Sequence, residues 1–177
     1  PSNPIATHVN VAGMGQPIQG IGHADIIQAH DNSWWMVIHG YRSVTGYPPH
    51  HILGRETCLV PVSWQQGGWP VINGNGSVPV NMTCPTLPLK PFQTKPTRTN
   101  FDTPELGLEW NYIQPPTAAN FELNTEKGTF TLQGSALKIG EKGNPAFVGR
   151  RLTNIQFEAT TRMEFNSKNE NEEAGMI

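Results

Sequence analysis

Short apolar runs separated by turn-forming residues characterise the first part of the chain. Residues 24–29 and 34–39 are strand-like and flank the cluster His-Asp-Asn-Ser at 30–33, which favours a turn. Residues 57–62 form a third run and residues 69–72 a short fourth. This spacing predicts a stack of small antiparallel sheets.

The second run is apolar on both of its faces. Trp34, Met36 and Ile38 alternate with Trp35 and Val37. A strand that is apolar on both faces is usually buried between two layers. We therefore expect Trp34 and Trp35 to belong to the core, whereas the tryptophans that flank the loop at 65–68 are expected to be more exposed.

The second part of the chain has a different pattern. Residues 155–165 alternate apolar and polar side chains without interruption, which predicts a long strand with one face on a core and the other in water. Residues 129–133 repeat the pattern with Phe130 and Leu132 pointing inward, and residues 145–149 are a third candidate. No window of eleven residues has a helical period, so the chain is predicted to be all-β.

A proline-rich stretch separates the two patterns. Residues 84–100 contain four prolines within twelve positions. Proline fixes φ and removes a hydrogen-bond donor, so this stretch is expected to be an extended, semi-rigid linker. The predicted organisation is therefore one region at 1–83, the linker at 84–100 and a second region at 101–177.

Composition and charge exclude several classes of protein. Glycine (18) and proline (16) are abundant among the 177 residues and charged residues make up only 15%, which argues against a helical bundle or a coiled coil. The net charge is −2 with no Lys/Arg stripe, so we expect no nucleic-acid partner. The longest apolar run, 34–38, is far shorter than the roughly 20 residues of a membrane span, so we expect no membrane partner. Two cysteines do not make a disulfide framework.

His23 and Asp25 form the first candidate site. They follow two glycines and stand two positions apart, a spacing that places both side chains on one face of a strand. The glycines would permit close approach of a ligand. A buried histidine that bonds a neighbouring carbonyl, with Asp25 closing a turn, explains the same pattern, and the spacing alone does not decide between the two.

Arg55 and Glu56 form the second candidate site, at the head of an apolar run. A guanidinium can grip two vicinal hydroxyls or a carboxylate with its planar fork. A structural ion pair between the two neighbours is the alternative. The adjacent His50 and His51 would point to opposite faces of an extended chain, which argues against joint metal ligation.

Acids are scarce in the first region. Residues 1–80 contain only Asp25, Asp31 and Glu56. Inverting glycoside hydrolysis needs two carboxyl groups roughly 6.5–9.5 Å apart, one of them with a raised pKa. Asp31 is expected in a turn and Glu56 is expected to stay ionised beside a guanidinium. By itself this region therefore has the character of part of a site.

A set of motifs runs in order through both regions. The motifs of the first region are Asn3-Pro4-Ile5, Pro17-Ile18-Gln19, Gly22-His23-Ala24-Asp25, Trp34-Trp35-Met36-Val37, Leu53-Gly54-Arg55-Glu56-Thr57, Pro61-Val62 and Gly68-Trp69-Pro70-Val71. Those of the second are Leu106-Gly107-Leu108-Glu109-Trp110, Pro145-Ala146-Phe147, Arg150-Arg151, Phe157-Glu158-Ala159-Thr160-Thr161 and Glu172-Glu173-Ala174-Gly175. Together these motifs resemble glycoside hydrolase family 43, most closely its β-xylosidases and α-L-arabinofuranosidases.

The resemblance implies the last blade or blades of a five-bladed β-propeller followed by the first part of a lectin-like, concanavalin A-like β-sandwich. It implies an inverting exo-glycosidase that removes terminal xylose or arabinose from hemicellulose-derived glycans. Its catalytic acid and base would lie in earlier blades, so no catalytic residue is expected in this chain, which alone should be inactive. A non-catalytic carbohydrate-binding module is the alternative function, and a purely structural role is expected for the sandwich.

The resemblance also assigns roles to two residues. Arg55 matches the arginine that bonds the hydroxyls of the innermost sugar, and His23 matches the histidine at the propeller centre. In some members that histidine lies beside a central calcium or its waters, so a structural calcium is allowed and no cofactor is required. Asp25 is expected to be structural, and Cys58 stands where an aromatic residue is common. The expected partners are a xylo- or arabino-oligosaccharide, the remainder of the same polypeptide and, in a homo-oligomer, further copies of it. An extracellular or periplasmic location is favoured over a cytoplasmic one.

Overall fold

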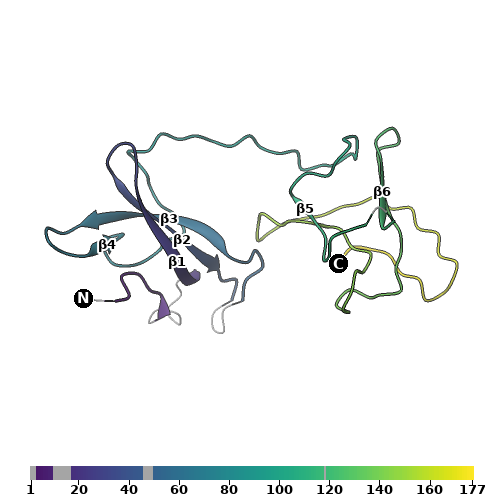
Figure 1. Cartoon of the computed structure of the whole chain (residues 1–177), viewed down its shortest axis with the longest axis horizontal. Coiled ribbons are helices and arrows are strands. Elements are labelled where there is room, and N and C mark those ends of the chain that lie inside the picture. Colours follow the sequence, from purple (N-terminus) through teal and green to yellow (C-terminus); the bar gives the residue numbers. More distant parts are fainter. Residues whose placement is uncertain (1–2, 10–16, 46–49, 118) are drawn as a thin grey trace.

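The computed structural model describes residues 3–9, 17–45, 50–117 and 119–177, and within these ranges it contains eight β-strands. The strands form one four-stranded sheet and two two-stranded sheets. The four-stranded sheet lies in the N-terminal part of the chain and the two small sheets lie in the C-terminal part (Figure 1). The predicted all-β character is confirmed.

The four predicted runs of the first region are the four strands of one antiparallel sheet. They are β1 (Ile18–Gln28), β2 (Trp34–Arg42), β3 (Glu56–Trp64) and β4 (Pro70–Ile72). Each strand pairs with the next along the chain, in the order β1-β2-β3-β4. The turn between β1 and β2 falls at the predicted place, where the N–H of Ala29 donates to the carbonyl of Ser33 at 2.8 Å.

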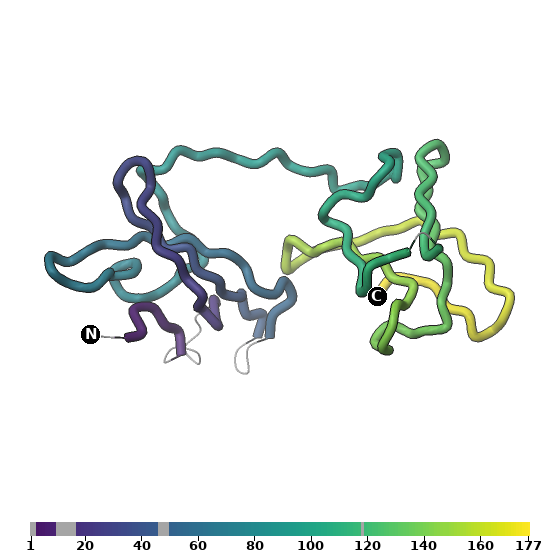
Figure 2. Tube along the Cα trace, viewed as in Figure 1, coloured from purple at the N-terminus to yellow at the C-terminus, as the bar shows by residue number. Residues whose placement is uncertain are grey.

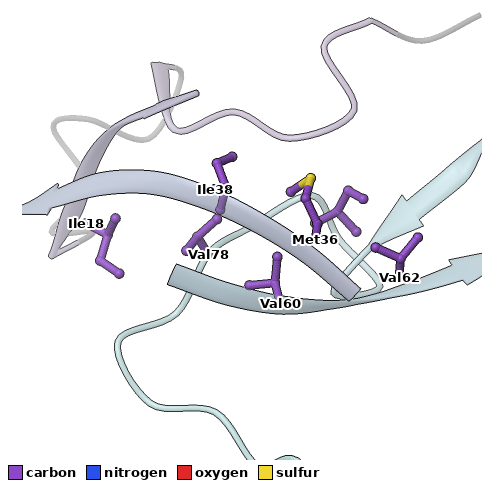
Figure 3. Packing of buried hydrophobic residues seen from close by; sticks show 7 residues of the cluster. Ile18, Met36, Ile38, Val60, Val62 and Val78 are labelled. Carbon is purple, nitrogen blue, oxygen red and sulfur yellow. The ribbon is translucent and has the colours of Figure 1, made fainter. Parts of the chain in front are cut away.

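One face of this sheet carries the core of the region. Because side chains alternate across a strand, Met36 and Ile38 of β2 point to the same side as Val60 of β3. Figure 3 shows these side chains meeting others from β1 and from the chain that follows β4. The buried cluster consists of Ile18, Met36, Ile38, Val60, Val62, Ile72 and Val78. Burial of this cluster is the main stabilising contribution to the sheet.

The other face of the sheet is apolar and largely open. Ile27 is 56% exposed, Val37 37% and Leu59 39%, although Trp35 on the same face is only 4% exposed. The pairing register joins β1, β2 and β3 across this face, with Val37 of β2 opposite Leu59 of β3. The prediction that β2 is buried on both faces therefore holds for the core face and for Trp35 but is wrong for Val37, which no layer of the described residues covers.

The second region contains four short strands around a cluster of aromatic rings. The strands β5 (Trp110–Asn111) and β8 (Gly149–Arg150) pair with each other, as do β6 (Phe121–Asn124) and β7 (Thr129–Leu132). The strand predicted at 129–133 is thus confirmed. Phe130 points inward as expected, whereas Leu132 is 38% exposed.

The long strand predicted at 155–165 is absent. Those residues have no regular structure, and Phe157, Met163 and Phe165 are 58%, 51% and 48% exposed. A strand needs a hydrogen-bonding neighbour, and the described residues offer this segment none. Figure 2 shows this segment in yellow-green, in the last part of the chain. Of the third candidate, 145–149, only Gly149 lies in a strand.

The chain between the two regions has no strand and is mostly exposed at 84–100. The side chains of Leu89 and Phe92 are 91% and 98% exposed. Figure 1 shows this part in teal as an extended connection between the two groups of strands. Among the described residues, no helix has the length and apolar character that crossing a bilayer requires.

Candidate functional site

His23 lies where β1 departs from regular pairing with β2. The register shifts between Gln19 and Gly22 and again between Gly22 and Asp25, and His23 has a φ of +50°. Such bulges re-aim a side chain, and here the imidazole is exposed with its ring centroid 6.1 Å from that of His39 on β2. The simple alternation used to place His23 and Asp25 on one face therefore does not apply.

The same irregular stretch of β1 makes room for a tyrosine of β2. Gly20 has a φ of +58°, and a Cβ atom at this position would run into the ring of Tyr41. The Tyr41 ring in turn stacks on His51, with ring centroids 4.6 Å apart and planes tilted by 39°. A glycine at position 20 is thus required both by the backbone and by the approach of Tyr41.

Arg55 immediately precedes β3. Its side chain is expected on the open face of the sheet, the face that also carries Val37 and Leu59. The register pairs His39 with Thr57 and Gly40 with Glu56, so by strand alternation Arg55 continues the row of His39 and Tyr41. The residues gathered at this end of the open face are His23, His39, Tyr41, His51 and Arg55, here called the histidine face. These residues come from β1, from β2 and from the segment that leads into β3.

Arg55 has no ion-pair or side-chain hydrogen-bond partner among the described residues, and its side chain is exposed. The predicted alternative, a structural pair with Glu56, is wrong. Glu56 instead accepts two hydrogen bonds from Arg42, from Nε to Oε2 and from Nη2 to Oε1, both at 2.9 Å. Neighbouring residues of an extended chain point to opposite faces, so Glu56 faces away from Arg55.

Arg42 and Glu56 shift each other's pKa. The hydrogen bonds from Arg42 lower the pKa of Glu56, and the carboxylate raises the pKa of Arg42. Burial works in the opposite direction for both groups and is the weaker influence. Glu56 therefore stays ionised and does not have the raised pKa of a general acid.

A buried histidine that bonds a neighbouring carbonyl, the alternative for position 23, exists instead at position 8. His8 is 2% exposed, and its Nδ1 lies 2.7 Å from the carbonyl oxygen of Ile18. His23 is exposed and Asp25 is exposed, so neither fits that alternative. The alternation of β2 could have pointed to His39 and Tyr41, whose roles the sequence interpretation missed.

Hydrogen bonds also lower the pKa of a second acid of the first region. Asp31 lies in the predicted turn, where hydrogen bonds from the side chain and backbone of Ser33 lower its pKa to about 2. No group of three or more His, Cys, Asp or Glu side chains in the described ranges could hold a metal. Calcium takes six to eight oxygen ligands, and the described residues place no such set around His23, so the calcium allowed there stays a prediction.

Two shallow pockets complete the picture. One, of about 360 Å³, opens on the core side of β2 and β3, and its lining includes Arg42, Glu56 and Cys58. Burial raises the pKa of the Cys58 thiol, which keeps it protonated and unreactive. The other, of about 230 Å³, lies among the aromatic rings of the second region and includes Trp110 and Phe121.

Comparison with known proteins gives two family matches in chain order. Residues 1–70 match "Glycosyl hydrolases family 43", and residues 98–177 match "Beta xylosidase C-terminal Concanavalin A-like domain". The chain belongs to glycosyl hydrolase family 43. The sheet β1–β4 is accordingly part of a β-propeller, and the second region is part of a concanavalin A-like β-sandwich, which confirms the predicted fold class.

Relatives of known activity support the same family. The chain is 38% identical over 177 residues to a non-reducing end α-L-arabinofuranosidase of Bacteroides ovatus, covering 100% of this chain and 33% of that protein. It is 31% identical over 180 residues to a xylosidase/arabinosidase of Butyrivibrio fibrisolvens, covering 100% of this chain and 34% of that protein. This chain therefore spans about a third of the length of these relatives.

Solved structures agree with the fold. A family 43 protein of the Bacteroides ovatus xyloglucan locus superposes with a TM-score of 0.74 at 39% identity, covering 85% of this chain and 29% of that one. A xylan β-1,4-xylosidase of Bacillus halodurans C-125 gives a TM-score of 0.76 at 28% identity, covering 87% of this chain and 29% of that one.

Proposed function

We propose that the complete protein is an inverting exo-glycosidase that removes terminal xylose or arabinose from hemicellulose-derived glycans. In this proposal the present chain supplies sugar-binding groups, while the carboxylates that transfer protons lie elsewhere in the polypeptide. The observation that carries it is the unpaired, exposed guanidinium of Arg55 on the histidine face. A guanidinium without a protein partner is available to bind a ligand through its N–H donors.

Arg55 would bind the innermost sugar by donating hydrogen bonds to the hydroxyl groups of that sugar. A planar guanidinium offers five N–H donors in a fixed fork, which suits two vicinal hydroxyl oxygens. Hydrogen bonds to sugar hydroxyls that strengthen in the transition state supply several kcal/mol in glycoside hydrolysis. His23, exposed and beside His39, would bound the same pocket from β1.

The scarcity of suitable acids in the first region supports the proposal that the proton-transferring carboxylates lie elsewhere in the polypeptide. Glu56 is held ionised by Arg42, and the pKa of Asp31 is lowered to about 2, so neither fits the general acid. The open apolar face with Ile27, Val37 and Leu59 fits a further layer of the same polypeptide. Location outside the cytoplasm remains part of the proposal, in keeping with a polysaccharide-derived substrate.

The test is hydrolysis of nitrophenyl β-xyloside and nitrophenyl α-L-arabinofuranoside by the full-length protein. Arg55→Ala should lower kcat/KM by about 100-fold, the loss typical when a preorganised hydrogen-bond donor is removed. Circular dichroism should confirm that the variant is folded. The chain of 177 residues alone should be inactive. Full activity of the Arg55→Ala variant, or turnover by the chain alone, would refute the proposal.

Assays of the same full-length protein also distinguish the proposed hydrolase from the alternative, a non-catalytic carbohydrate-binding module. A carbohydrate-binding module would bind xylan through the second region, whose 230 Å³ pocket is lined by aromatic side chains, with no hydrolysis by the full-length protein. Xylan retention without turnover of either nitrophenyl glycoside would favour that alternative.

A further inference from the structure

The Arg42–Glu56 pair lies on the opposite side of the sheet from Arg55 but at the same level of the strands. Gly40 is the register partner of Glu56, so the pair joins β2 and β3 diagonally, one step beyond the last paired residues. Both of its hydrogen bonds are 2.9 Å long and the contact is bidentate. This geometry fixes the direction as well as the distance of the two side chains.

The backbone just before this pair, at Gly54 and Arg55, lies outside the pairing of β2 with β3. Gly54 has a φ of +77°, and no atom lies within 4 Å of the position that its Cβ would occupy. Arg55 itself makes no side-chain hydrogen bond or ion pair with any described residue. The placement of the Arg55 guanidinium therefore depends on where the backbone at the start of β3 is held.

We infer that Arg42 is a positioning residue: its bidentate bond to Glu56 fixes the start of β3 and thereby aims Arg55 into the sugar pocket. Arg42 does not touch the sugar, because it faces the core side of the sheet and the 360 Å³ pocket there. The inference rests on the function proposed for Arg55. It adds a residue on the far side of the sheet to the determinants of activity.

The expected loss of activity follows from the effect of displacing the Arg55 guanidinium from its position. A displacement of a binding group by about 1 Å can reduce turnover by about 100-fold. The pair itself is partly open to solvent, with side-chain exposures of 35% and 31%, so it contributes little to global stability. Its loss should consequently lower activity much more than it lowers the melting temperature.

The experiment is a double-mutant cycle in the full-length protein with nitrophenyl glycosides as substrates. Arg42→Met should lower kcat/KM by about 10- to 100-fold, and Arg42→Lys should restore part of the loss. In the Arg55→Ala background, Arg42→Met should change kcat/KM by less than about twofold, because the group that it positions is gone. Lys95→Met, which breaks the 3.1 Å ion pair of Lys95 with Glu109, is the matched control and should leave kcat/KM unchanged.

The outcomes separate this inference from the function on which it rests. If Arg55→Ala retains activity, the proposed function fails. If Arg55→Ala is inactive but Arg42→Met matches the wild type, or if the two losses multiply, the positioning role is overturned. Should Arg42→Met fail to fold, Glu56→Gln replaces it in the cycle, since the glutamine keeps the size of the side chain and removes its charge.

Discussion

His8 and Val78 lie seventy positions apart and are joined by a hydrogen bond in which the backbone N–H of Val78 donates to Nε2 of His8 at 3.0 Å. The other ring nitrogen, Nδ1, lies 2.7 Å from the carbonyl oxygen of Ile18 and donates to it. With Nε2 as acceptor, the ring is the neutral tautomer that carries its proton on Nδ1. One imidazole thus ties the N-terminal segment to the start of β1 and to the chain after β4.

Replacing His8 by Phe should destabilise the first region. The phenyl ring fills the space but leaves a carbonyl and an N–H unpaired in a site that is 2% exposed. The loss should be about 2 to 4 kcal/mol in the free energy of unfolding, the cost of two buried polar groups without partners. Urea denaturation of the full-length protein measures it. His30→Phe at an exposed position is the control, and an equal loss at both positions would contradict this account.

Asp31 should make the turn between β1 and β2 sensitive to acid. Its pKa in the folded state is lowered to about 2 from 3.8, so it contributes stability above pH 3.8 that is lost as the pH falls toward 2. Asp31→Asn should lower the melting temperature at pH 6, and the difference from the wild type should shrink progressively below pH 3.8. Melting curves recorded between pH 6 and pH 3 would measure this trend. Asp102→Asn, at an exposed position, is the matched control, and a pH-independent difference for Asp31→Asn would rule out the charge as its cause.

Gly20→Ala should cost more than Gly67→Ala, although both glycines have a left-handed backbone. Left-handed backbone alone costs an L-residue about 1 to 2 kcal/mol. At Gly20 the added methyl group would also collide with the ring of Tyr41, adding about 1 to 3 kcal/mol. Gly67→Ala isolates the first contribution, because Gly67 has a φ of +65° with open space around it. Equal melting temperatures for the two variants would show that Tyr41 does not pack as described.

The sheet β1–β4 was predictable because its strands follow local rules. The apolar runs and the turn at 30–33 are properties of neighbouring residues, and the structure has a strand at each run and a turn between the first two. The segment at 155–165 has an equally regular alternation but no strand, because strand formation depends on a partner that local sequence does not supply. Alternation therefore located strands only where the chain also supplied the neighbouring strand.

The candidate site shows the same division. Arg55 could be singled out from its residue type and its place at a strand head, but the partner of Glu56 could not, since Arg42 is brought to it by the pairing of β2 with β3. His39 and Tyr41 were accessible in principle from the alternation of β2. The irregular course of β1 at His23 was not, because two register shifts depend on how β1 pairs with β2.

Phe121 should be a sensitive aromatic position of the second region. Its ring stacks on Tyr112 and on Phe130, with centroids 5.7 Å and 5.5 Å away. Phe130 continues the stack to Phe101 at 5.6 Å, so Phe121 joins β6 to both β7 and the neighbouring loop. Stacked pairs contribute about 0.5 to 1.5 kcal/mol each beyond the burial of their area.

Phe121→Ala should therefore lower the free energy of unfolding of this region by about 2 to 4 kcal/mol, through lost burial and two lost ring contacts. Phe92→Ala, at a linker position that is 98% exposed, should change it by less than about 0.5 kcal/mol. Near-ultraviolet circular dichroism and thermal melting of the full-length variants make the comparison. If the Phe92 variant lost as much stability as the Phe121 variant, the aromatic stack would not be what holds the second region together, and its strands would owe their order to contacts outside the described residues.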